Sequence, residues 1–393
     1  MRLRTTMRRG IEAPGTGAPR SGVLRSVAAT VCLFVGAVAA VGAEPQLGLP
    51  PVPVPADNPQ SQAKIDLGRM LFMDRRLSPD DTMSCGMCHV PEQGFVSNEL
   101  GGAVGFEGRS HRRNTPTVLN AAYFQRLFHD GREISLENQI WGPLLSFNEM
   151  ANAAPGVVIE KIRAQPEYRG LFERAFDGRG PSMLTVGQAI ASYERTLVSG
   201  DSRFDRWYYG KSESALDARE QRGFALFMGK GGCASCHTVN ADWALFSDDA
   251  FHNTGVGYAR SHPQESHGRK RTVELAPGVM VEVDEQTIAS FSEPGLDDVG
   301  RYEITLDPVD RWAYRTPTLR NIALTAPYMH DGSFKTLEEV IDFYDRGGID
   351  NPEKDPLVRP LNLQASEKAD LAAFLRALTG SNAKALAAAA RGR

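Results

Sequence analysis

The sequence CGMCH at residues 85–89 decides the fold, and a second stretch of the same form, CASCH, lies at residues 233–237. A Cys-x-x-Cys pair alone fits a zinc half-site, a redox dithiol or a disulfide. The His that follows both pairs decides between these interpretations, because only 8 of the 393 residues are His and zinc ribbons separate their pairs by roughly 15–20 residues, far fewer than here. The two stretches therefore predict two covalently attached haems of the c type.

Each attachment site is expected to hold its haem in the same way. Two thiols form thioether bonds to the macrocycle, and the adjacent His reaches the iron from one face. The predicted attachment residues are Cys85, Cys88, Cys233 and Cys236, and the predicted proximal iron ligands are His89 and His237.

The first 43 residues have the pattern of a secretory signal peptide. An Arg-rich start is followed by an apolar run from Val27 to Val41 and by small residues that end at Ala43. The run has about 15 residues, short of the roughly 20 that span a bilayer, so a cleaved signal is favoured over a membrane anchor. The fifth cysteine, Cys32, lies in this segment. We therefore expect a periplasmic protein that begins near Glu44 and is not inserted in a membrane after cleavage.

Net charge indicates which partners to expect. The formal charge is −4, and removal of residues 1–43, with six Arg and Glu12, changes it to −9. Such an acidic protein is not expected to bind nucleic acid, whereas it attracts a basic electron donor.

The chain contains an internal repeat. Residues 115–137 match residues 316–338 without a gap at an offset of 201, and ten of the 23 positions are identical. Each copy follows its own Cys-x-x-Cys-His site, and similar lead-ins, LGRMLF at 67–72 and RGFALF at 222–227, precede the two sites. The repeat predicts two homologous haem domains in tandem.

We predict a mainly α protein built from two tandem cytochrome c-like haem domains with long loops. Apolar residues at three- and four-residue spacing indicate helices at 182–197 and 365–378. Residues 251–314 lack a clear period and receive no assignment, and His252, His262 and His267 within them receive no function. The expected organisation is a signal peptide at 1–43, an N-terminal haem domain at 44–200, a C-terminal haem domain at 201–380 and a flexible tail at 381–393.

The repeat allows the two iron sites to be compared. Tyr344 in the second copy corresponds to Pro143 in the first. A tyrosine oxygen can ligate haem iron, whereas proline has no donor atom. The alignment predicts a second haem closed by His237 and Tyr344 and a first haem with one open face. Because Tyr344 lies in a helical run, a packed aromatic residue is an equally good interpretation at this point.

An open face beside Glu149 suits peroxide. A carboxylate can take a proton from the bound oxygen and return it to the leaving one. A lone Glu is more often a solvated surface residue, and this interpretation stays open. If Glu149 faces the haem, the chain is an oxidoreductase rather than an electron carrier.

In combination, these motifs resemble the bacterial diheme cytochrome c peroxidase and MauG superfamily, from about Asn58 to Gly380. The resemblance implies that the N-terminal haem is the peroxidatic one. It also implies a distal pocket formed by Gln139, Pro143 and Glu149, with Glu149 as the acid and base.

The resemblance has two further implications. Tyr344 lies in an FYDRGG context similar to that of MauG-like members, which place a Tyr on the second haem where other members place a Met. A calcium ion between the haems would be bound by the side chain of Asn114 and the backbone carbonyls of Thr325 and Pro327. Oxygen donors of this kind suit calcium.

The sequence departs from the superfamily at three places. His129 stands where a Trp usually lies between the haems, so His129 is expected to bridge them by hydrogen bonds or tunnelling. Gly231 stands where MauG has a surface Trp. Phe106 aligns with a loop His that closes the first haem in some peroxidases. His111 in the same loop is expected to be a surface residue, with a resting iron ligand as the alternative.

The leading hypothesis is a periplasmic diheme peroxidase that reduces hydrogen peroxide at the N-terminal haem with electrons delivered through the C-terminal haem. The expected electron donor is a small cytochrome c or a cupredoxin. One alternative is a MauG-like enzyme that oxidatively modifies residues of a partner protein. The other is a non-catalytic diheme electron carrier, which predicts two six-coordinate irons.

Overall fold

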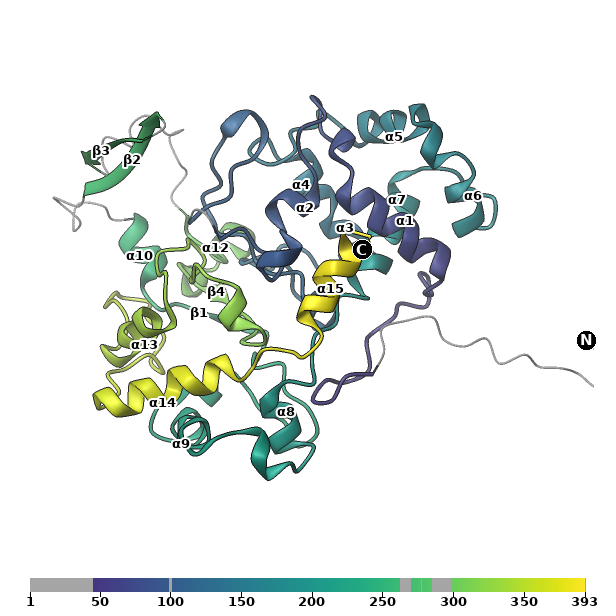
Figure 1. The fold of residues 1–393 in the computed structure, drawn as a ribbon. Helices are drawn as coiled ribbons and strands as arrows, with labels where there is room; N and C mark the ends of the chain where they lie inside the picture. The colour runs from purple at the N-terminus through teal and green to yellow at the C-terminus, as the bar shows by residue number, and fades with distance from the viewer. Residues whose placement is uncertain (1–44, 99–100, 262–269, 277, 285–297, 393) are drawn as a thin grey trace, which may run out of the picture. The chain divides into compact units, whose positions relative to one another are not determined.

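Figure 1 shows the computed structural model of the chain, which describes residues 45–98, 101–261, 270–276, 278–284 and 298–392. The predicted signal peptide at 1–43 lies outside the described residues, as do His262 and His267. The account below concerns the described ranges.

The described chain is mainly helical, as predicted. Four helices of 11 or 12 residues carry most of the packing: α1 (Gln62–Met73), α7 (Met183–Glu194), α9 (Ala218–Met228) and α14 (Ala365–Arg376). The predicted helices at 182–197 and 365–378 correspond to α7 and α14. The other helices are α2 (Cys85–Cys88), α3 (Leu136–Gln139), α4 (Trp141–Leu145), α5 (Pro155–Ala164), α6 (Leu171–Ala175), α8 (Arg203–Tyr208), α10 (Val256–Ser261), α12 (Tyr302–Thr305), α13 (Leu337–Asp345) and α15 (Ala383–Ala390).

A glycine lies at the main helix crossing of each half. Helix α1 packs against α7 in the first half, and α9 packs against α14 in the second. A Cβ on Gly68 would lie 1.9 Å from the carbonyl oxygen of Ala189, and a Cβ on Gly223 would lie 2.1 Å from that of Asp370. These distances are far below van der Waals contact, so only glycine allows the helices to approach this closely. The close crossing explains why Gly recurs in the two lead-in sequences.

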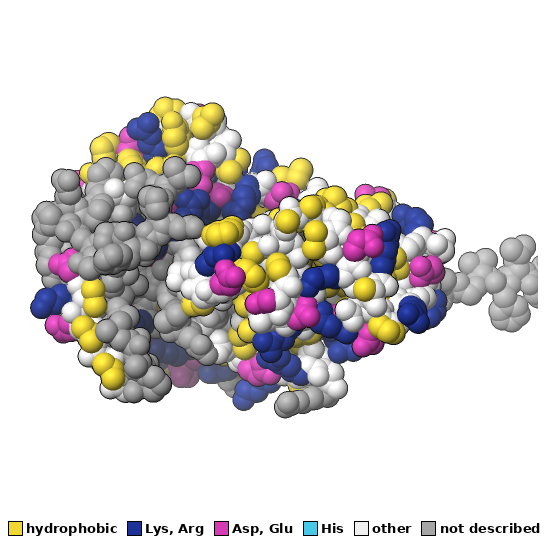
Figure 2. Space-filling view, turned by 90° about the horizontal axis from the view of Figure 1, so that it is seen from above, with side chains coloured by type: hydrophobic (Ala, Val, Ile, Leu, Met, Phe, Trp, Pro, Cys, Tyr) yellow, Lys and Arg dark blue, Asp and Glu magenta, His cyan; other side chains and the backbone are white. Residues whose placement is uncertain are grey.

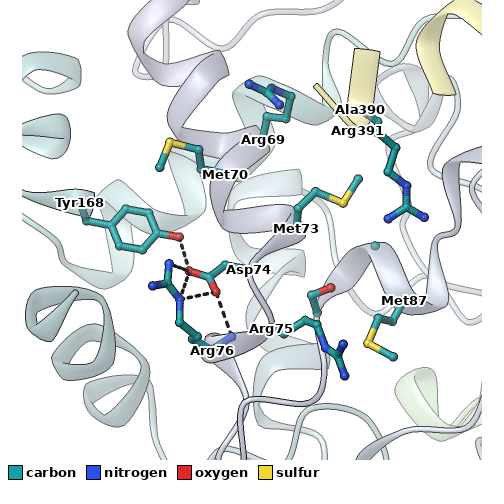
Figure 3. A pocket seen from close by; sticks show the side chains of 12 residues that line it. Arg69, Met70, Met73, Asp74, Arg75, Arg76, Met87, Tyr168, Ala390 and Arg391 are labelled. Atoms are coloured by element: carbon teal, nitrogen blue, oxygen red, sulfur yellow. Dashed lines mark hydrogen bonds and ion pairs between the residues drawn. The ribbon is translucent and has the colours of Figure 1, made fainter. Parts of the chain in front are cut away.

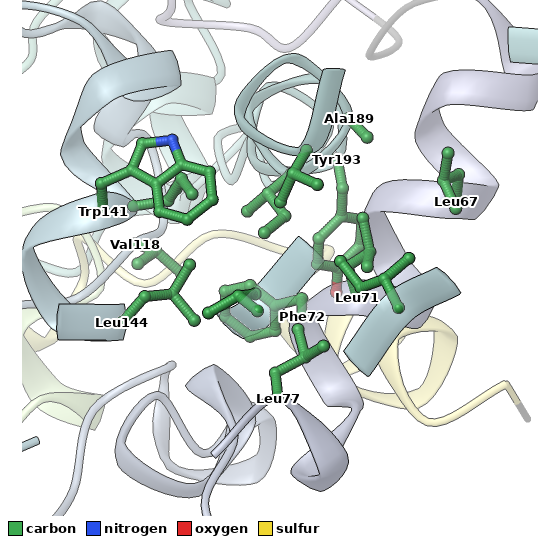
Figure 4. Close-up of a cluster of buried hydrophobic side chains, with 14 of the residues drawn as sticks. Leu67, Leu71, Phe72, Leu77, Val118, Trp141, Leu144, Ala189 and Tyr193 are labelled. Atoms are coloured by element: carbon green, nitrogen blue, oxygen red, sulfur yellow. The ribbon is translucent and has the colours of Figure 1, made fainter. Parts of the chain in front are cut away.

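Each half has its own hydrophobic core. In the first, Phe72 on α1 and Tyr193 on α7 lie with ring centroids 5.4 Å apart, and Cys85 packs against the cluster (Figure 4). In the second half, Cys233 packs against a cluster of buried hydrophobic side chains that lie between Phe204 and Leu378 in the sequence. Each haem attachment site thus borders the core of its own half. We keep residue 200 as the proposed boundary between the haem domains.

The internal repeat has the same local backbone in both copies. Asn120 and Asn321 are left-handed, with φ of 63° and 60°, and each precedes a short 3-10 helix, η4 (Ala121–Tyr123) or η10 (Ile322–Leu324). Ser135 and Thr336 then cap α3 and α13 with their side chains. Asn tolerates the left-handed conformation better than most residues, which accounts for Asn at both positions.

The two copies of the repeat meet in a reciprocal contact. The backbone N–H of Asn114 donates to the carbonyl oxygen of His330 at 2.6 Å, and the N–H of Arg315 donates to that of His129 at 2.8 Å. Asn114 and Arg315 are 201 residues apart, and so are His129 and His330. Equivalent residues therefore exchange equivalent bonds, as in a local two-fold arrangement.

Residues 251–314, for which the sequence predicts no structure, contain parts of two small sheets. Strand β1 (Phe251–His252) pairs antiparallel with β4 (Tyr314–Arg315). Strands β2 (Lys270–Ala276) and β3 (Val279–Asp284) form a separate antiparallel pair. Because β1 and β4 have 2 residues each, they are too short to show a hydrophobic period.

The C-terminal segment is not the flexible tail that the sequence predicted. Helix α15 packs Leu386 and Ala390 against the first core, and Arg391 pairs with Glu92 at 3.1 Å. Alanine favours a helix, and its small side chain allows close packing without a stripe of large apolar residues. The pattern of large apolar residues therefore did not reveal this helix.

Charged side chains of both signs are interspersed with apolar ones over the face shown in Figure 2. Such a mixture is ordinary for a protein surface in contact with water. Among the described residues, no helix is both long and apolar enough to cross a bilayer.

Candidate haem centres

The proximal histidines are held in the same way at both attachment sites. His89 Nδ1 lies 3.2 Å from the carbonyl oxygen of Phe95, and His237 Nδ1 lies 2.8 Å from that of Phe246. An N–H at Nδ1 donates to these carbonyls, which leaves Nε2 as the free nitrogen for a metal. Burial lowers the pKa of both imidazoles, so both are neutral at pH 7, as metal ligands must be.

The cysteines of the described chain are free thiols. Burial raises the pKa of Cys85 and Cys233 to about 12 and that of Cys88 to about 11. Thiols with such values are protonated at neutral pH and react poorly as nucleophiles, which argues against a redox dithiol. Their position beside a free imidazole nitrogen and a hydrophobic core fits thioether attachment of a haem.

Pro143 and Glu149 are brought together by the segment that follows helix α4. The N–H of Met150 donates to the Pro143 carbonyl at 3.1 Å, and the N–H of Glu149 donates to the Ser146 carbonyl at 3.0 Å. These bonds fold the segment back towards α4. Gln139 ends helix α3 just before it, but no side-chain hydrogen bond joins Gln139 to Glu149 within the described ranges.

Glu149 lies close to the first attachment site. Burial is the main cause of the raised pKa of Cys88, and the negative charge of Glu149 adds to it. The same charge acts on His89. The Glu149 side chain is 22% exposed, so the interpretation as a solvated surface residue is wrong.

His111 pairs with Glu149. Its Nε2 lies 2.8 Å from Glu149 Oε1, and 27% of its side chain is exposed. Burial works to raise the pKa of Glu149, but the hydrogen bond and charge of His111 outweigh it and hold the pKa below its usual value. Glu149 is therefore an anion at neutral pH. His111 is partly exposed, and the structure adds a hydrogen-bonded pair with Glu149 that the sequence did not predict.

Tyr344 lies on helix α13, near the second attachment site. Burial raises the pKa of its phenol, and the thiols of Cys236 and Cys233 act in the same direction. The ring packs edge-on against Phe343 with centroids 5.3 Å apart. Its hydroxyl makes no hydrogen bond within the described part of the chain. The side chain of Tyr344 is half-buried, and a phenol oxygen without a hydrogen-bond partner among the described residues, beside the haem cysteines, is available to ligate iron.

The reciprocal contact between the halves includes His129, which is half-buried, and His330, which is buried. His129 Nε2 lies 2.9 Å from the carbonyl oxygen of Asn114, and burial lowers its pKa to about 3. The His330 ring stacks on Tyr314 with centroids 3.5 Å apart, and burial lowers its pKa to about 4. Both imidazoles are therefore neutral at physiological pH, and neither ring takes up a second proton there.

Asn114 and Pro327 meet at the same contact. Asn114 Nδ2 donates to the Pro327 carbonyl oxygen at 2.6 Å, while Asn114 Oδ1 is buried without a partner among the described residues. A buried oxygen without a partner, next to a second oxygen, suits a hard cation such as calcium. Thr325, the third predicted ligand, follows η10 two residues before Pro327.

A buried ion-pair network supports the reciprocal contact. Arg113 donates to Asp298 at 2.7 and 2.8 Å and to Asp130 at 2.5 Å. Burial works to raise the pKa of Asp298, but Arg113 outweighs it and holds that pKa well below its usual range. No motif in the sequence pointed to this network, because Arg113 and Asp298 are 185 positions apart.

His252 joins two carboxylates beside the second attachment site. Its Nδ1 lies 2.5 Å from Asp355 and its Nε2 lies 2.9 Å from Asp248. The Cys236 thiol and these two carboxylates raise the pKa of His252 to about 10. If Cys236 forms a thioether bond to a haem, its thiol no longer raises the pKa of His252. The carboxylates of Asp248 and Asp355 still do. Sequence reasoning missed this cluster, since nothing in the local pattern links Asp355 to His252.

A pocket of about 620 Å³ lies on the outer side of helix α2 (Figure 3). It is lined by Gly86 and Met87, the two residues between the first pair of cysteines, and by four Arg side chains. Asp74 accepts from Arg76 at 2.8 Å there. Neither Glu149 nor a haem cysteine lines this pocket.

Comparisons with known proteins agree with the motifs. The di-haem cytochrome c peroxidase family model matches residues 62–213. The cytochrome-c peroxidase IdrP1 of Pseudomonas sp. strain SCT is 40% identical over 375 residues, 90% of this chain and 91% of that protein. The methylamine utilization protein MauG of Methylorubrum extorquens is 38% identical over 328 residues, 83% of this chain and 81% of that protein.

A solved structure shows the same fold. A MauG-like protein associated with microbial copper homeostasis is 34% identical, with a TM-score of 0.67, over 86% of this chain and 95% of that one. The two attachment sites account for the two c-type haems of such proteins, and the relatives are oxidoreductases. The chain belongs to the di-haem cytochrome c peroxidase family, which includes MauG.

Proposed function

We propose that this protein is a periplasmic peroxidase that reduces hydrogen peroxide at the haem of the N-terminal half, with electrons that enter through the haem of the C-terminal half. One observation carries the proposal. The half-buried carboxylate of Glu149 lies beside the attachment site of the first haem, whereas Tyr344 lies beside that of the second. Relatives named cytochrome-c peroxidase support peroxide as the substrate.

The reaction takes up two electrons and two protons per hydrogen peroxide and yields two water molecules. When bound, the haem supplies the iron that coordinates peroxide and passes electrons to it. Glu149, an anion, accepts a proton from the nearer peroxide oxygen and delivers it to the other oxygen, which leaves as water. Pro143 has no donor atom and leaves the iron face open, and Gln139 orients peroxide by a hydrogen bond.

Tyr344 is the distal ligand of the second haem in this proposal. An anionic oxygen ligand favours ferric iron, so this haem has a lower potential than one ligated by Met. With His237 and Tyr344 as its ligands, the second haem would have no position for peroxide and would supply electron transfer. The donor is a small basic cytochrome c or cupredoxin, attracted by the formal charge of −9 that remains without residues 1–43.

Electrons cross between the halves at the reciprocal contact, through His129. Its hydrogen bond to Asn114 and the bond from Asn114 to His330 form a continuous link between the two copies of the repeat. A calcium ion held by Asn114, Thr325 and Pro327 fixes the same contact.

Steady-state oxidation of a reduced small cytochrome by hydrogen peroxide tests the proposal. We expect turnover by the protein with both haems attached, and a loss of about 100-fold or more in Glu149→Gln, because acid–base groups contribute about 10²–10⁴-fold. Absence of turnover with both haems in place would overturn it. So would a wild-type rate in Glu149→Gln.

A second candidate function is the oxidation of residues on a partner protein, as the name of the MauG relative and the MauG-like context of Tyr344 suggest. Gly231 weighs against it, because this residue is buried and a Cβ there would lie 2.9 Å from the Leu226 carbonyl oxygen. No surface aromatic residue can occupy that position. Mass spectrometry of co-expressed partner proteins after peroxide treatment distinguishes the two: new oxidative modifications support this function, and unmodified partners support peroxide reduction alone.

A further inference from the structure

Loop 101–113 packs over the segment that carries Glu149. The N–H of Phe106 donates to the Glu149 carbonyl oxygen at 2.8 Å. Arg109 donates to the carbonyl oxygen of Phe147 at 3.0 Å, and its guanidinium lies 3.5 Å from the centroid of the Phe147 ring. Loop 101–113 is thus hydrogen-bonded to the backbone of both Phe147 and Glu149, and it covers the segment that contains them.

His111 is the residue of this loop that reaches the carboxylate. Its backbone N–H donates to the carbonyl oxygen of Ala103 at 2.9 Å, and its Nε2 lies 2.8 Å from Glu149 Oε1. Its Nδ1 makes no hydrogen bond within the described ranges, and 27% of the side chain is exposed. The imidazole therefore has one nitrogen on the carboxylate and the other available to solvent.

The charges around the pair leave His111 as the direct partner of the carboxylate. Arg132 and His89 act on Glu149 more weakly than His111 does. The titratable groups that act on Glu149 besides His111 are Arg132, from the segment before α3, and the imidazole of His89, at the end of α2. Within the loop, Arg109 pairs with Glu107 and Arg112 pairs with Glu303, at 2.5 Å each.

Peroxide reduction requires a proton supply at this site. Each turnover consumes two protons, while Glu149 only moves a proton from one peroxide oxygen to the other. Both consumed protons must come from solvent, from which Glu149 is largely shielded. An imidazole can accept a proton at one nitrogen while it gives one from the other.

We propose that His111 carries protons from solvent to Glu149, an inference that rests on the peroxidase function proposed above. A proton enters at Nδ1, and Nε2 passes its own proton to the Glu149 carboxylate, which delivers it to the oxygen that remains after the first water molecule has left. Two such transfers supply the two protons that convert this oxygen into the second water molecule, and a flip of the ring resets the tautomer. The electrons come from the donor, so no further reactant is required. His111 acts through Glu149 and is a positioning residue.

Two substitutions of His111 separate proton transfer from simple support. In His111→Gln the amide still donates a hydrogen bond to Glu149 but cannot carry a proton, and in His111→Ala both are lost. We expect kcat to fall roughly 10–100-fold in both, with a larger solvent isotope effect, since acid–base groups contribute on this scale or above. Added imidazole is expected to restore kcat in His111→Ala alone. The ferric spectrum of the first haem is expected to stay unchanged.

The pH dependence gives a second readout. Without His111, burial acts on Glu149 with less opposition, so the pKa of Glu149 rises. Because the reaction needs the carboxylate, the acid limb of the kcat profile moves to higher pH, further in His111→Ala than in His111→Gln. Arg109→Gln is the matched control, since it loosens the loop at Phe147 but leaves the His111–Glu149 pair.

An unchanged kcat and pH profile in His111→Gln would overturn the inference. So would an equal loss in Arg109→Gln together with an altered ferric spectrum, which would indicate that the loop only supports the pocket. These failures are distinct from failure of the peroxidase function. A dead Glu149→Gln beside a normal His111→Gln removes the proton route alone, whereas an active Glu149→Gln removes the proposed function.

Discussion

The first and second haem attachment sites have the same supporting backbone but different residues at equivalent positions. At both sites a backbone carbonyl holds Nδ1 of the proximal His, and a glycine at a helix crossing brings two long helices together. At one pair of equivalent positions, however, the first copy has Pro143 and the second has Tyr344. The framework is thus duplicated, and in the function that we propose a few side chains distinguish the two haems.

A second pair of equivalent positions shows the same principle. Glu149 and Asp350 are 201 residues apart. The Glu149 side chain is 22% exposed and pairs with His111, whereas the Asp350 side chain is 95% exposed and pairs with Lys354 at 3.1 Å. An acidic residue at an equivalent position is therefore not enough for acid–base chemistry, which also needs burial and a partner that keeps the carboxylate ionised.

The largest effect is expected for Glu149→Gln, with Asp350→Asn as its counterpart in the other half. Loss of the carboxylate should lower kcat/KM for hydrogen peroxide by about 10²–10⁴-fold. The exposed Asp350 should be replaceable without loss. Steady-state kinetics on both variants measure the contrast, and similar rates for the two would remove the distinction between the halves.

The next effect concerns Arg113, whose counterpart in the repeat is Tyr314. Arg113→Ala leaves Asp298 as an unpaired buried charge, while Asp130 keeps its ion pair with Arg132, and should lower the free energy of unfolding by about 3–5 kcal/mol. Tyr314→Phe loses one hydrogen bond, from the hydroxyl to the Asp298 carbonyl at 2.9 Å, which contributes about 1 kcal/mol. Chemical denaturation of both variants with haems attached measures the difference, and equal losses would contradict it.

The same network predicts how stability depends on pH. The folded pKa of Asp298 lies well below its unfolded value of 3.8, so its stabilising contribution is complete above about pH 4 and is lost as the pH falls further. Asp298→Asn should abolish that part of the acid dependence. Unfolding measured between pH 2 and 6 tests this, and an unchanged acid profile in the variant would show that other carboxylates are responsible.

Calcium is expected to act at the contact between the halves. A bound ion at 100 times its dissociation constant adds about 2.7 kcal/mol to the free energy of unfolding. Addition of calcium to chelator-treated protein should therefore raise its melting temperature. Asn114→Ala, which removes the unpaired Oδ1, should abolish the rise. A calcium response that survives in this variant would place the ion elsewhere.

The smallest effect on stability is expected for His129→Phe. The variant leaves the Asn114 carbonyl without its hydrogen bond at 2.9 Å and should lose about 1 kcal/mol of stability. The kcat profile between pH 5 and 8 should keep its shape, because the pKa of His129 is lowered to about 3 and the residue is neutral throughout. A shifted profile would mean that His129 takes part in proton transfer.

Local sequence patterns predicted the features that depend on local chemistry. The Cys-x-x-Cys-His stretches identified both haem sites because attachment needs those residues side by side. The repeat predicted the matching backbone of the two halves, and apolar spacing predicted α7 and α14. Comparison of the copies also singled out Glu149 and Tyr344, whose roles remain proposals.

Contacts between distant segments were beyond local patterns. His111 and Glu149 are 38 positions apart, and His252 and Asp355 are 103 apart, so no spacing rule connects them. The sequence predicts a tail where helix α15 forms, because the packing of this helix relies on small Ala side chains. In each case the side chains are buried against a remote part of the chain. A single sequence does not show which distant segments come into contact.

The inequality of the two sites is tested most directly by the ferric spectrum of the protein with both haems attached. We predict one high-spin haem, in the first site, and one low-spin haem, in the second. Tyr344→Phe should change the low-spin signal and leave the high-spin signal unchanged. Two low-spin haems at rest, or a low-spin signal that is unchanged in Tyr344→Phe, would contradict the assignment of an open first haem and a tyrosine-closed second one.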